Sequence, residues 1–208
     1  MTSTSNQRSA LTLPTAAQLH ANEARWGDLL RLAWWTCKAM LAGWFGKIAI
    51  ALMYLIAWAY LALFLTSDAR SLGIAVAMAA PLALAAVAVL IAVIAVLIWA
   101  TYLARSNCGV YLSRRDDAAI VLILRRRGRT IEPSNHVARN VGKKQAAQFR
   151  KDLGEPLFQW LNTNRVRLQA QVTSRKVLKI YLSEWGQFGL KHVKCGRLVY
   201  APTGWTRR

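Results

Sequence analysis

Two long uncharged runs constrain the fold of this chain more than any other feature of its sequence. Ile48–Leu65 and Gly73–Ala100 contain no charged side chain over 18 and 28 residues, respectively. A helix needs about 20 mostly apolar residues to cross the hydrocarbon core of a bilayer. A chain of 208 residues offers too little other protein to bury two such helices. We therefore predict two transmembrane helices, at about 48–65 and 73–100, joined into a hairpin by the polar segment 66–72.

Positive charge is concentrated in the second half of the chain. Residues 105–208 hold 22 of the 28 Lys and Arg residues and six of the nine acidic residues, so +16 of the total net charge of +19 lies there. The predicted turn between the two helices holds a single cation, Arg70. Because loops rich in Lys and Arg stay on the cytoplasmic side, we expect a two-span membrane protein with both termini in the cytoplasm.

The residues before the first predicted span divide into two parts. Residues 1–25 begin with a run rich in Ser, Thr, Asn and Gln, and we expect a disordered polar tail without a signal peptide. Residues 26–45 interleave five aromatic side chains with Arg31 and Lys38, a composition typical of the bilayer interface. Two interpretations remain: a separate interfacial helix, or the cytoplasmic end of the first membrane helix. Both place residues 26–104 in a membrane region.

After residue 104 the pattern changes to the short elements of a small domain, residues 105–208. Runs rich in β-branched residues or alternating at period two predict strands at 108–112, 118–124, 130–137, 165–172, 190–193 and 198–200. Helices are predicted at 145–152 and 156–161, interrupted at Gly154 and Pro156, and from the capping residue Ser174 to Gly186. The expected fold class is α/β, with a two-helix membrane hairpin followed by a mixed sheet.

A basic hexapeptide connects a predicted strand to a predicted helix. Its residues are Arg139, Asn140, Val141, Gly142, Lys143 and Lys144. The first amides of a helix lack intrahelical partners and bind anions, so this turn, with Gln145 at the start of the helix, is an expected phosphate site. The alternative is an ordinary basic turn, because turns that contain glycine are common.

The order of elements around this turn resembles that of the GNAT-type N-acetyltransferase family, over residues 109–201. The acyl-CoA signature of that family is Arg/Gln-x-x-Gly-x-Gly/Ala, and Arg139, Gly142 and Lys144 stand at its three defined positions. Lys144 departs from the pattern, since the family has a small residue there. The resemblance implies a mixed-sheet acyltransferase fold in which residues 139–145 bind acetyl-CoA.

A second motif strengthens the resemblance. The family has a later helix that carries a tyrosine and ends in Gly-Phe, and Tyr181, Gly186 and Phe188 are similar to it. Gln187 is inserted before the phenylalanine, which departs from the family. Two further departures are the interrupted helix after the turn and the missing elements at the front of the domain.

The resemblance also implies roles for individual residues. In the family the amine attacks the thioester directly, and Tyr181 stands where a tyrosine protonates the leaving thiolate. Glu132 is the only carboxylate on the strand before the turn and is the first candidate for the base. Asn135 and His136 are alternatives on that strand, and a histidine has a suitable ordinary pKa. No metal is expected, because the Cys and His residues show no ligand spacing.

Three functions fit these observations. The first is a membrane-anchored N-acetyltransferase that moves an acetyl group from acetyl-CoA to a small-molecule or protein amine on the cytoplasmic side. The second is a non-catalytic membrane protein whose basic domain binds nucleic acid or anionic lipid, for example an accessory factor of a mobile element. The third is a helical-hairpin assembly protein. The chain has no helix-turn-helix, zinc or RNA-binding motif, which disfavours specific nucleic-acid recognition.

Overall fold

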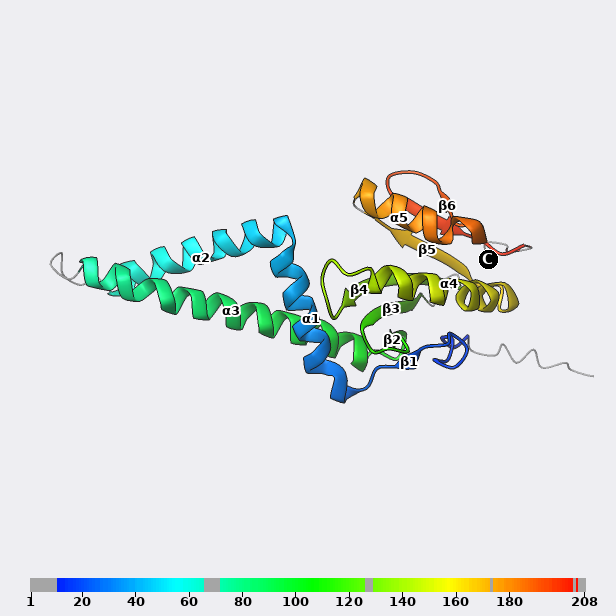
Figure 1. Cartoon of the computed structure of the whole chain (residues 1–208), viewed down its shortest axis with the longest axis horizontal. Helices are drawn as coiled ribbons and strands as arrows, with labels where there is room; N and C mark the ends of the chain where they lie inside the picture. The colour runs from blue at the N-terminus through cyan, green and yellow to red at the C-terminus, as the bar shows by residue number, and fades with distance from the viewer. Residues whose placement is uncertain (1–10, 66–71, 126–128, 173, 204, 206–208) are drawn as a thin grey trace, which may run out of the picture. The chain divides into compact units, whose positions relative to one another are not determined.

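The computed structural model describes residues 11–65, 72–125, 129–172, 174–203 and 205 (Figure 1). The chain divides into two compact units. The helical unit consists of residues 25–104 and 137–143, and the sheet unit consists of residues 1–24, 105–136 and 144–208. One boundary falls between residues 104 and 105, where the composition of the sequence also changes.

The helical unit begins with a short 3₁₀ turn, η1 (Trp26–Asp28), and continues with three α-helices: α1 (Leu29–Ala42), α2 (Trp44–Leu65) and α3 (Leu72–Ala104). Gly43 has extended backbone angles, φ −78° and ψ 142°, and separates α1 from α2. Three aromatic residues of the segment, Trp26, Trp34 and Trp35, therefore lie before Gly43 in η1 and α1, whereas Trp44 and Phe45 begin α2. The predicted joining turn, including Arg70, lies outside the described residues except for Leu72.

One face of α1 is buried within the helical unit. Leu32, Trp35 and Thr36 lie on that face, and Thr36 accepts a hydrogen bond from the indole N–H of Trp99 on α3, at 2.7 Å. Trp99 is fully buried, so this bond satisfies a donor that water does not reach. The opposite face carries Leu30 and Trp34, which are exposed.

The helices α2 and α3 pack side by side (Figure 1). Among the described residues, one segment, Pro81–Ala104 of α3, has the length and apolar composition needed to cross a membrane, and Ile50–Tyr60 forms a shorter apolar segment. The first predicted span, 48–65, falls within α2. Two spans and the orientation of the termini stay predictions, since a helix buried in a soluble core can have the same length and composition.

The sheet unit is built on a seven-stranded mixed sheet with the strand order β1-β2-β3-β4-β5-β7-β6. Its strands are β1 (Asn22–Glu23), β2 (Cys108–Leu112), β3 (Ala118–Arg125), β4 (Thr130–Ala138), β5 (Arg167–Gln171), β6 (Lys191–His192) and β7 (Arg197–Tyr200). The predicted α/β class with a mixed sheet is confirmed. The interior strand β3 is buried along most of its length, which explains its continuous apolar run.

The only parallel pair described in this sheet, β4 with β5, is short. The two strands pair at Thr130 with Arg167 and at Ile131 with Leu168, and no further pair joins their described residues. The neighbouring pairs β2–β3 and β5–β7 are antiparallel and longer. The sheet therefore opens between β4 and β5 after its first two residue pairs.

The N-terminal segment contradicts the prediction of a disordered tail over residues 1–25. From residue 11 to residue 24 the chain packs into the sheet unit: β1 pairs with β2, Leu19 is buried, and the Tyr111 hydroxyl donates to the carbonyl oxygen of Pro14 at 2.6 Å. A strand of two residues is too short to show a period in the sequence, and its partner β2 is distant in the chain. Residues 1–10 lie outside the described residues.

The predicted interruption at Gly154 and Pro156 is wrong, because α4 is one helix from Gln145 to Thr163. Its apolar face, which includes Leu153, Leu157 and Leu161, is fully buried, and this tertiary burial outweighs the local cost of the two helix breakers. Gly154 has a packing role. A Cβ atom there would lie 2.7 Å from Cε2 of Phe188, so only glycine allows this close approach.

The last helix, α5, runs from Arg175 to Trp185. The Ser174 hydroxyl accepts from the amide of Lys176 at 3.2 Å and caps the helix as predicted. At the other end, α5 gives way to a 3₁₀ turn, η3 (Gly186–Phe188). The helices α4 and α5 contact each other, and α4 also contacts β3.

Candidate active site

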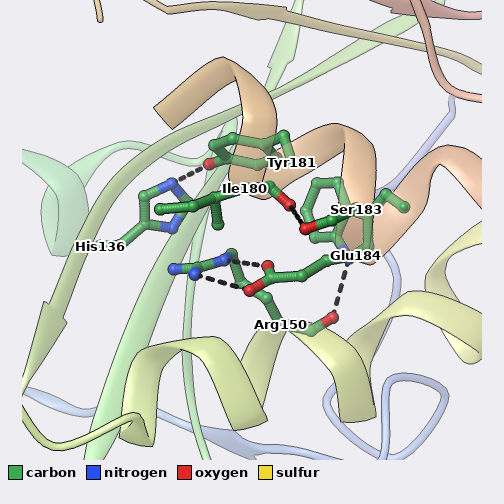
Figure 2. A network of polar contacts seen from close by, with 7 residues as sticks. His136, Arg150, Ile180, Tyr181, Ser183 and Glu184 are labelled. Atoms are coloured by element: carbon green, nitrogen blue, oxygen red, sulfur yellow. Dashed lines mark hydrogen bonds and ion pairs between the residues drawn. The ribbon is translucent and has the colours of Figure 1, made fainter. Parts of the chain in front are cut away.

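Three polar side chains from three elements of the sheet unit gather around Tyr181 (Figure 2). His136 comes from β4, Arg150 from α4, and Tyr181 and Glu184 from α5. Residues 181 and 184 are three apart, so they lie on the same face of their helix. Trp185 anchors that face, since it is fully buried and its indole N–H donates to the carbonyl oxygen of Arg150 at 2.8 Å.

Tyr181 and His136 are joined by a hydrogen bond. The Tyr181 hydroxyl contacts Nε2 of His136, and the two ring centroids lie 5.6 Å apart at an interplanar angle of 52°. The other ring nitrogen of His136, Nδ1, is buried and has no hydrogen-bond partner among the described residues. An unpartnered buried nitrogen is costly, so such a group calls for a functional explanation.

Arg150 and Glu184 form a bidentate ion pair beside this contact. Arg150 Nε lies 2.6 Å from Oε2 of Glu184, and a second guanidinium nitrogen lies 3.1 Å from Oε1. The exposed fractions of the two side chains are 12% and 6%. The guanidinium carbon also lies 5.7 Å from the centre of the Tyr181 ring. The pair therefore fixes α5 against α4 and holds the Tyr181 ring in place.

Both members of the Tyr181–His136 pair are neutral at pH 7. Burial lowers the pKa of His136 to about 3, and the positive charge of Arg150 acts in the same direction. Burial raises the pKa of Tyr181; the charge of Arg150 opposes this shift and that of Glu184 adds to it. The pair therefore has neither an imidazolium nor a phenolate, and a proton can pass along the hydrogen bond.

The structure brings together two of the three predicted catalytic residues, Tyr181 and His136. Glu132 lies elsewhere on β4: its Oε2 is 2.5 Å from Nε of Arg125, and no contact links it to Tyr181 among the described residues. Glu132 and His136 are four positions apart, roughly 13 Å along an extended strand. The geometry thus favours His136, an alternative base in the sequence, over Glu132. Asn135 is half-buried.

Arg150 and Glu184 are functional candidates that sequence reasoning misses. One signal points to Glu184, because it is the only acidic residue of α5 and is next to Trp185 on the apolar side of that helix. A carboxylate in such a position needs a cationic partner. The identity of the partner cannot be read from the sequence, because Arg150 lies on a different helix.

The expected acyl-CoA turn has the local conformation that the sequence predicts. It follows β4, Gly142 has the left-handed φ of +85°, and α4 begins at Gln145 without a capping side chain from Lys144. Residues 137–143 belong to the helical unit, where Lys38 donates to the carbonyl oxygen of Arg139 at 2.5 Å. Lys144 and Gln145 belong to the sheet unit. The expected cofactor residues Arg139, Asn140, Val141, Gly142, Lys143, Lys144 and Gln145 are therefore divided between the two units.

A basic pocket lies at the start of α4, within the sheet unit. Its volume is about 650 Å³. It is lined by Arg114, Arg115, Lys144 and Gln145, with His20, Ser113, Asp117, Gln148, Phe149 and Asp152. Cationic side chains and the first amides of a helix are the groups that bind phosphate. The part of the sheet unit next to the turn is therefore suited to an anionic group.

Metal chemistry has no candidate ligand set in the part of the chain that the structure describes, since no three His, Cys, Asp or Glu side chains cluster there. The chemistry available at Tyr181 is proton transfer between neutral groups. Comparison of the chain with protein-family models, with curated proteins and with solved structures finds no significant match to any of them.

Proposed function

We propose that this protein is a membrane-anchored N-acetyltransferase that transfers an acetyl group from acetyl-CoA to an amine on the cytoplasmic side of the membrane. The observation that carries the proposal is the hydrogen bond between Tyr181 and His136. The sequence identifies both residues as candidates for proton transfer, and they are 45 positions apart in the chain.

The topology of the sheet supports the same reaction. Where β4 and β5 separate after Ile131 and Leu168, their facing N–H and C=O groups no longer pair with each other and need other partners. An extended ligand with amide groups, such as the pantetheine arm of CoA, can bond to such strands. The continuous helix α4 also removes one departure from the family, the interrupted helix after the turn.

Acetyl-CoA supplies the acetyl group and a thiolate leaving group. The new bond joins the amine nitrogen to the acetyl carbon, and the bond between that carbon and sulfur breaks. His136 accepts the amine proton at Nδ1 and passes its own Nε2 proton to the Tyr181 oxygen, while Tyr181 gives its hydroxyl proton to the leaving sulfur. Because the pKa of His136 is about 3, an imidazolium would not persist, so the two transfers must be concerted.

Anchoring by two spans is part of the proposal. The segment Pro81–Ala104 meets the length and hydropathy needed for one span, and the uncharged run 48–65 within α2 supplies the other. The excess of Lys and Arg after residue 104 favours a cytoplasmic sheet unit, where acetyl-CoA would be available.

The decisive test uses the whole protein in an uncharged detergent, because residues 11–24 belong to the sheet unit and would be lost from a fragment that starts at residue 105. Calorimetry should detect acetyl-CoA binding, and thiol release in the presence of a panel of amines should detect turnover. A folded protein that fails to bind acetyl-CoA at millimolar concentration contradicts the proposal. Salt-sensitive binding of DNA by the same preparation would then support the alternative function of a basic binding module.

A further inference from the structure

A second pocket of the sheet unit lies at the other end of β4 from the turn at residues 139–144. Its volume is about 510 Å³. It is lined by Arg129, Arg165 and Trp160, with Leu11, Thr12, Leu13, Thr15, Gln18, Thr163 and Asn164. Among the described residues, this lining has two arginines and no carboxylate. The pocket at the start of α4, in contrast, is also lined by Asp117 and Asp152.

Arg129 and Arg165 are neighbours because each stands just before one strand of the parallel pair. The amide of Arg167 donates to the carbonyl oxygen of Arg129 at 2.9 Å, and Thr130 pairs with Arg167 in the register of β4 and β5. Both side chains are exposed at the pocket. Two exposed arginines on adjacent chain segments therefore line the same pocket.

Both arginines have a backbone conformation that favours glycine or asparagine. The φ angle is +48° at Arg129 and +52° at Arg165, in the left-handed region that is strained for most side chains. Arg165 follows the end of α4: its amide donates to Asn162 at 3.1 Å, and the amide of Val166 donates to Leu161 at 2.9 Å. That bonding pattern usually has glycine in the position of Arg165.

The backbone therefore does not explain why arginine occupies either position. Neither guanidinium forms an ion pair with any described residue, whereas Arg125 and Arg150 are paired with Glu132 and Glu184. The lining therefore has two positive charges and, among the described residues, no counter-charge, which an anion would supply. The planar, forked donors of the two guanidinium groups match the oxygens of a phosphate group.

We propose that this pocket binds a phosphate ester, with its phosphate between Arg129 and Arg165. The buried indole of Trp160 and the half-buried side chains of Leu11 and Leu13 provide an apolar wall for the rest of the ligand. The ligand is either a soluble phosphate ester or the headgroup of an anionic phospholipid, which present the same chemistry to the two arginines. The site is independent of the proposed acetyl transfer.

Calorimetry with the whole protein in phosphate-free, uncharged detergent tests the proposal. The probes are inorganic phosphate and glycerol 3-phosphate, and both should bind to the wild type.

Arg129→Asn and Arg165→Asn should each weaken binding at least about tenfold, the loss expected for one charge-assisted hydrogen bond. Because asparagine tolerates the left-handed region, both variants should melt at or above the wild-type temperature. Lys151→Gln removes an exposed cation outside both described pockets and should leave the affinity unchanged.

Added phosphatidylglycerol identifies the source of the ligand. If it competes with inorganic phosphate and phosphatidylcholine does not, the occupant is an anionic headgroup; if neither competes, the occupant is a soluble ester. Two results would overturn the proposal: a wild type that binds neither phosphate probe, or Asn variants that bind them as tightly as Lys151→Gln. Asn variants that unfold would assign the arginines a structural role and would also overturn it.

Discussion

The Tyr181 hydroxyl on α5 is hydrogen-bonded to Nε2 of His136 on β4, and Nδ1 of the same imidazole is buried without a partner among the described residues. The imidazole thus has one nitrogen bonded to a phenol and the other buried without a partner among the described residues. The proposed relay from an incoming amine to a leaving thiolate would use both nitrogens of this imidazole.

Replacement of Tyr181 by Phe tests the relay. The change removes the hydroxyl proposed to protonate the leaving thiolate, so turnover should fall by about 10²–10⁴-fold. The affinity for acetyl-CoA should stay the same. The melting temperature should fall slightly, because Nε2 of His136 loses its partner. Steady-state kinetics, calorimetry and thermal melts measure the three quantities.

Tyr200→Phe is the matched control for this variant. The Tyr200 hydroxyl donates to Asn162 on α4, away from the Tyr181–His136 pair. Loss of that hydroxyl should leave turnover unchanged. Equal effects of the two substitutions on turnover would show that Tyr181 acts only through packing.

The Arg150–Glu184 pair should contribute strongly to stability. Glu184→Gln leaves the nearly buried guanidinium of Arg150 without its counter-charge, which typically costs about 3–5 kcal/mol. The free energy of unfolding, from urea titration of the sheet unit's signal, measures this loss. Glu132→Gln serves as the control: its partner Arg125 is 64% exposed, so the loss should not exceed about 1 kcal/mol.

Stability should depend on pH through His136. Its pKa is about 3 in the folded protein against 6.5 for the unperturbed group, so the unfolded chain binds more protons between these two values. The free energy of unfolding should therefore decrease as the pH falls from 6.5 toward 3, by up to about 1.4 kcal/mol per pH unit from this group.

Comparison with His136→Gln isolates that contribution, because all carboxylates are kept. The variant should show a shallower loss of stability over the same pH range in parallel urea titrations. Identical slopes for the two proteins would mean that His136 titrates in the native state as it does in the unfolded chain.

Gly196 should tolerate no side chain. It has a φ of +73°, and a Cβ atom there would lie 2.1 Å from the carbonyl oxygen of Val172. Gly196→Ala should therefore destabilise the turn between β6 and β7 by at least about 1–3 kcal/mol. Gly186→Ala is the control, since a Cβ atom at that position would meet no neighbouring group within 4 Å. The melting temperature of this control should stay close to that of the wild type.

Local pattern is sufficient to predict many elements of the sheet unit. The strand predicted at 108–112 is β2, and the cap at Ser174 and the end of α5 before Gly186 are where the sequence places them. The prediction fails where tertiary contacts decide. Packing of Phe188 against Gly154 and burial of Leu157 keep α4 continuous. The residues that make these contacts are far apart in the chain, so a short stretch of sequence does not reveal them.

The candidate site shows the same limit. A tyrosine on an amphipathic helix and a histidine on a strand can each be identified from the sequence, but their hydrogen bond depends on how α5 packs against the sheet. The sequence favours Glu132 over His136 because Glu132 is the only carboxylate on its strand; its ion pair with Arg125 involves the neighbouring strand β3. The partner of a charged residue is therefore the information that the sequence lacks.

The position of β1 also bears on how the protein is synthesised. Asn22 and Glu23 pair with Leu112 and Tyr111, so the ribosome makes this edge strand before helices α1–α3 and makes its partner after them. The sheet unit cannot pair β1 with β2 until the whole helical segment, residues 25–104, has emerged from the ribosome. The amide of Ala24 donates to the carbonyl oxygen of Val110 at 2.9 Å, so these two residues, which flank the helical segment in the chain, are neighbours within the sheet unit. The helices are thus an insertion within the sheet domain, and a short linker from Ala24 to Cys108 should be enough to join its two parts.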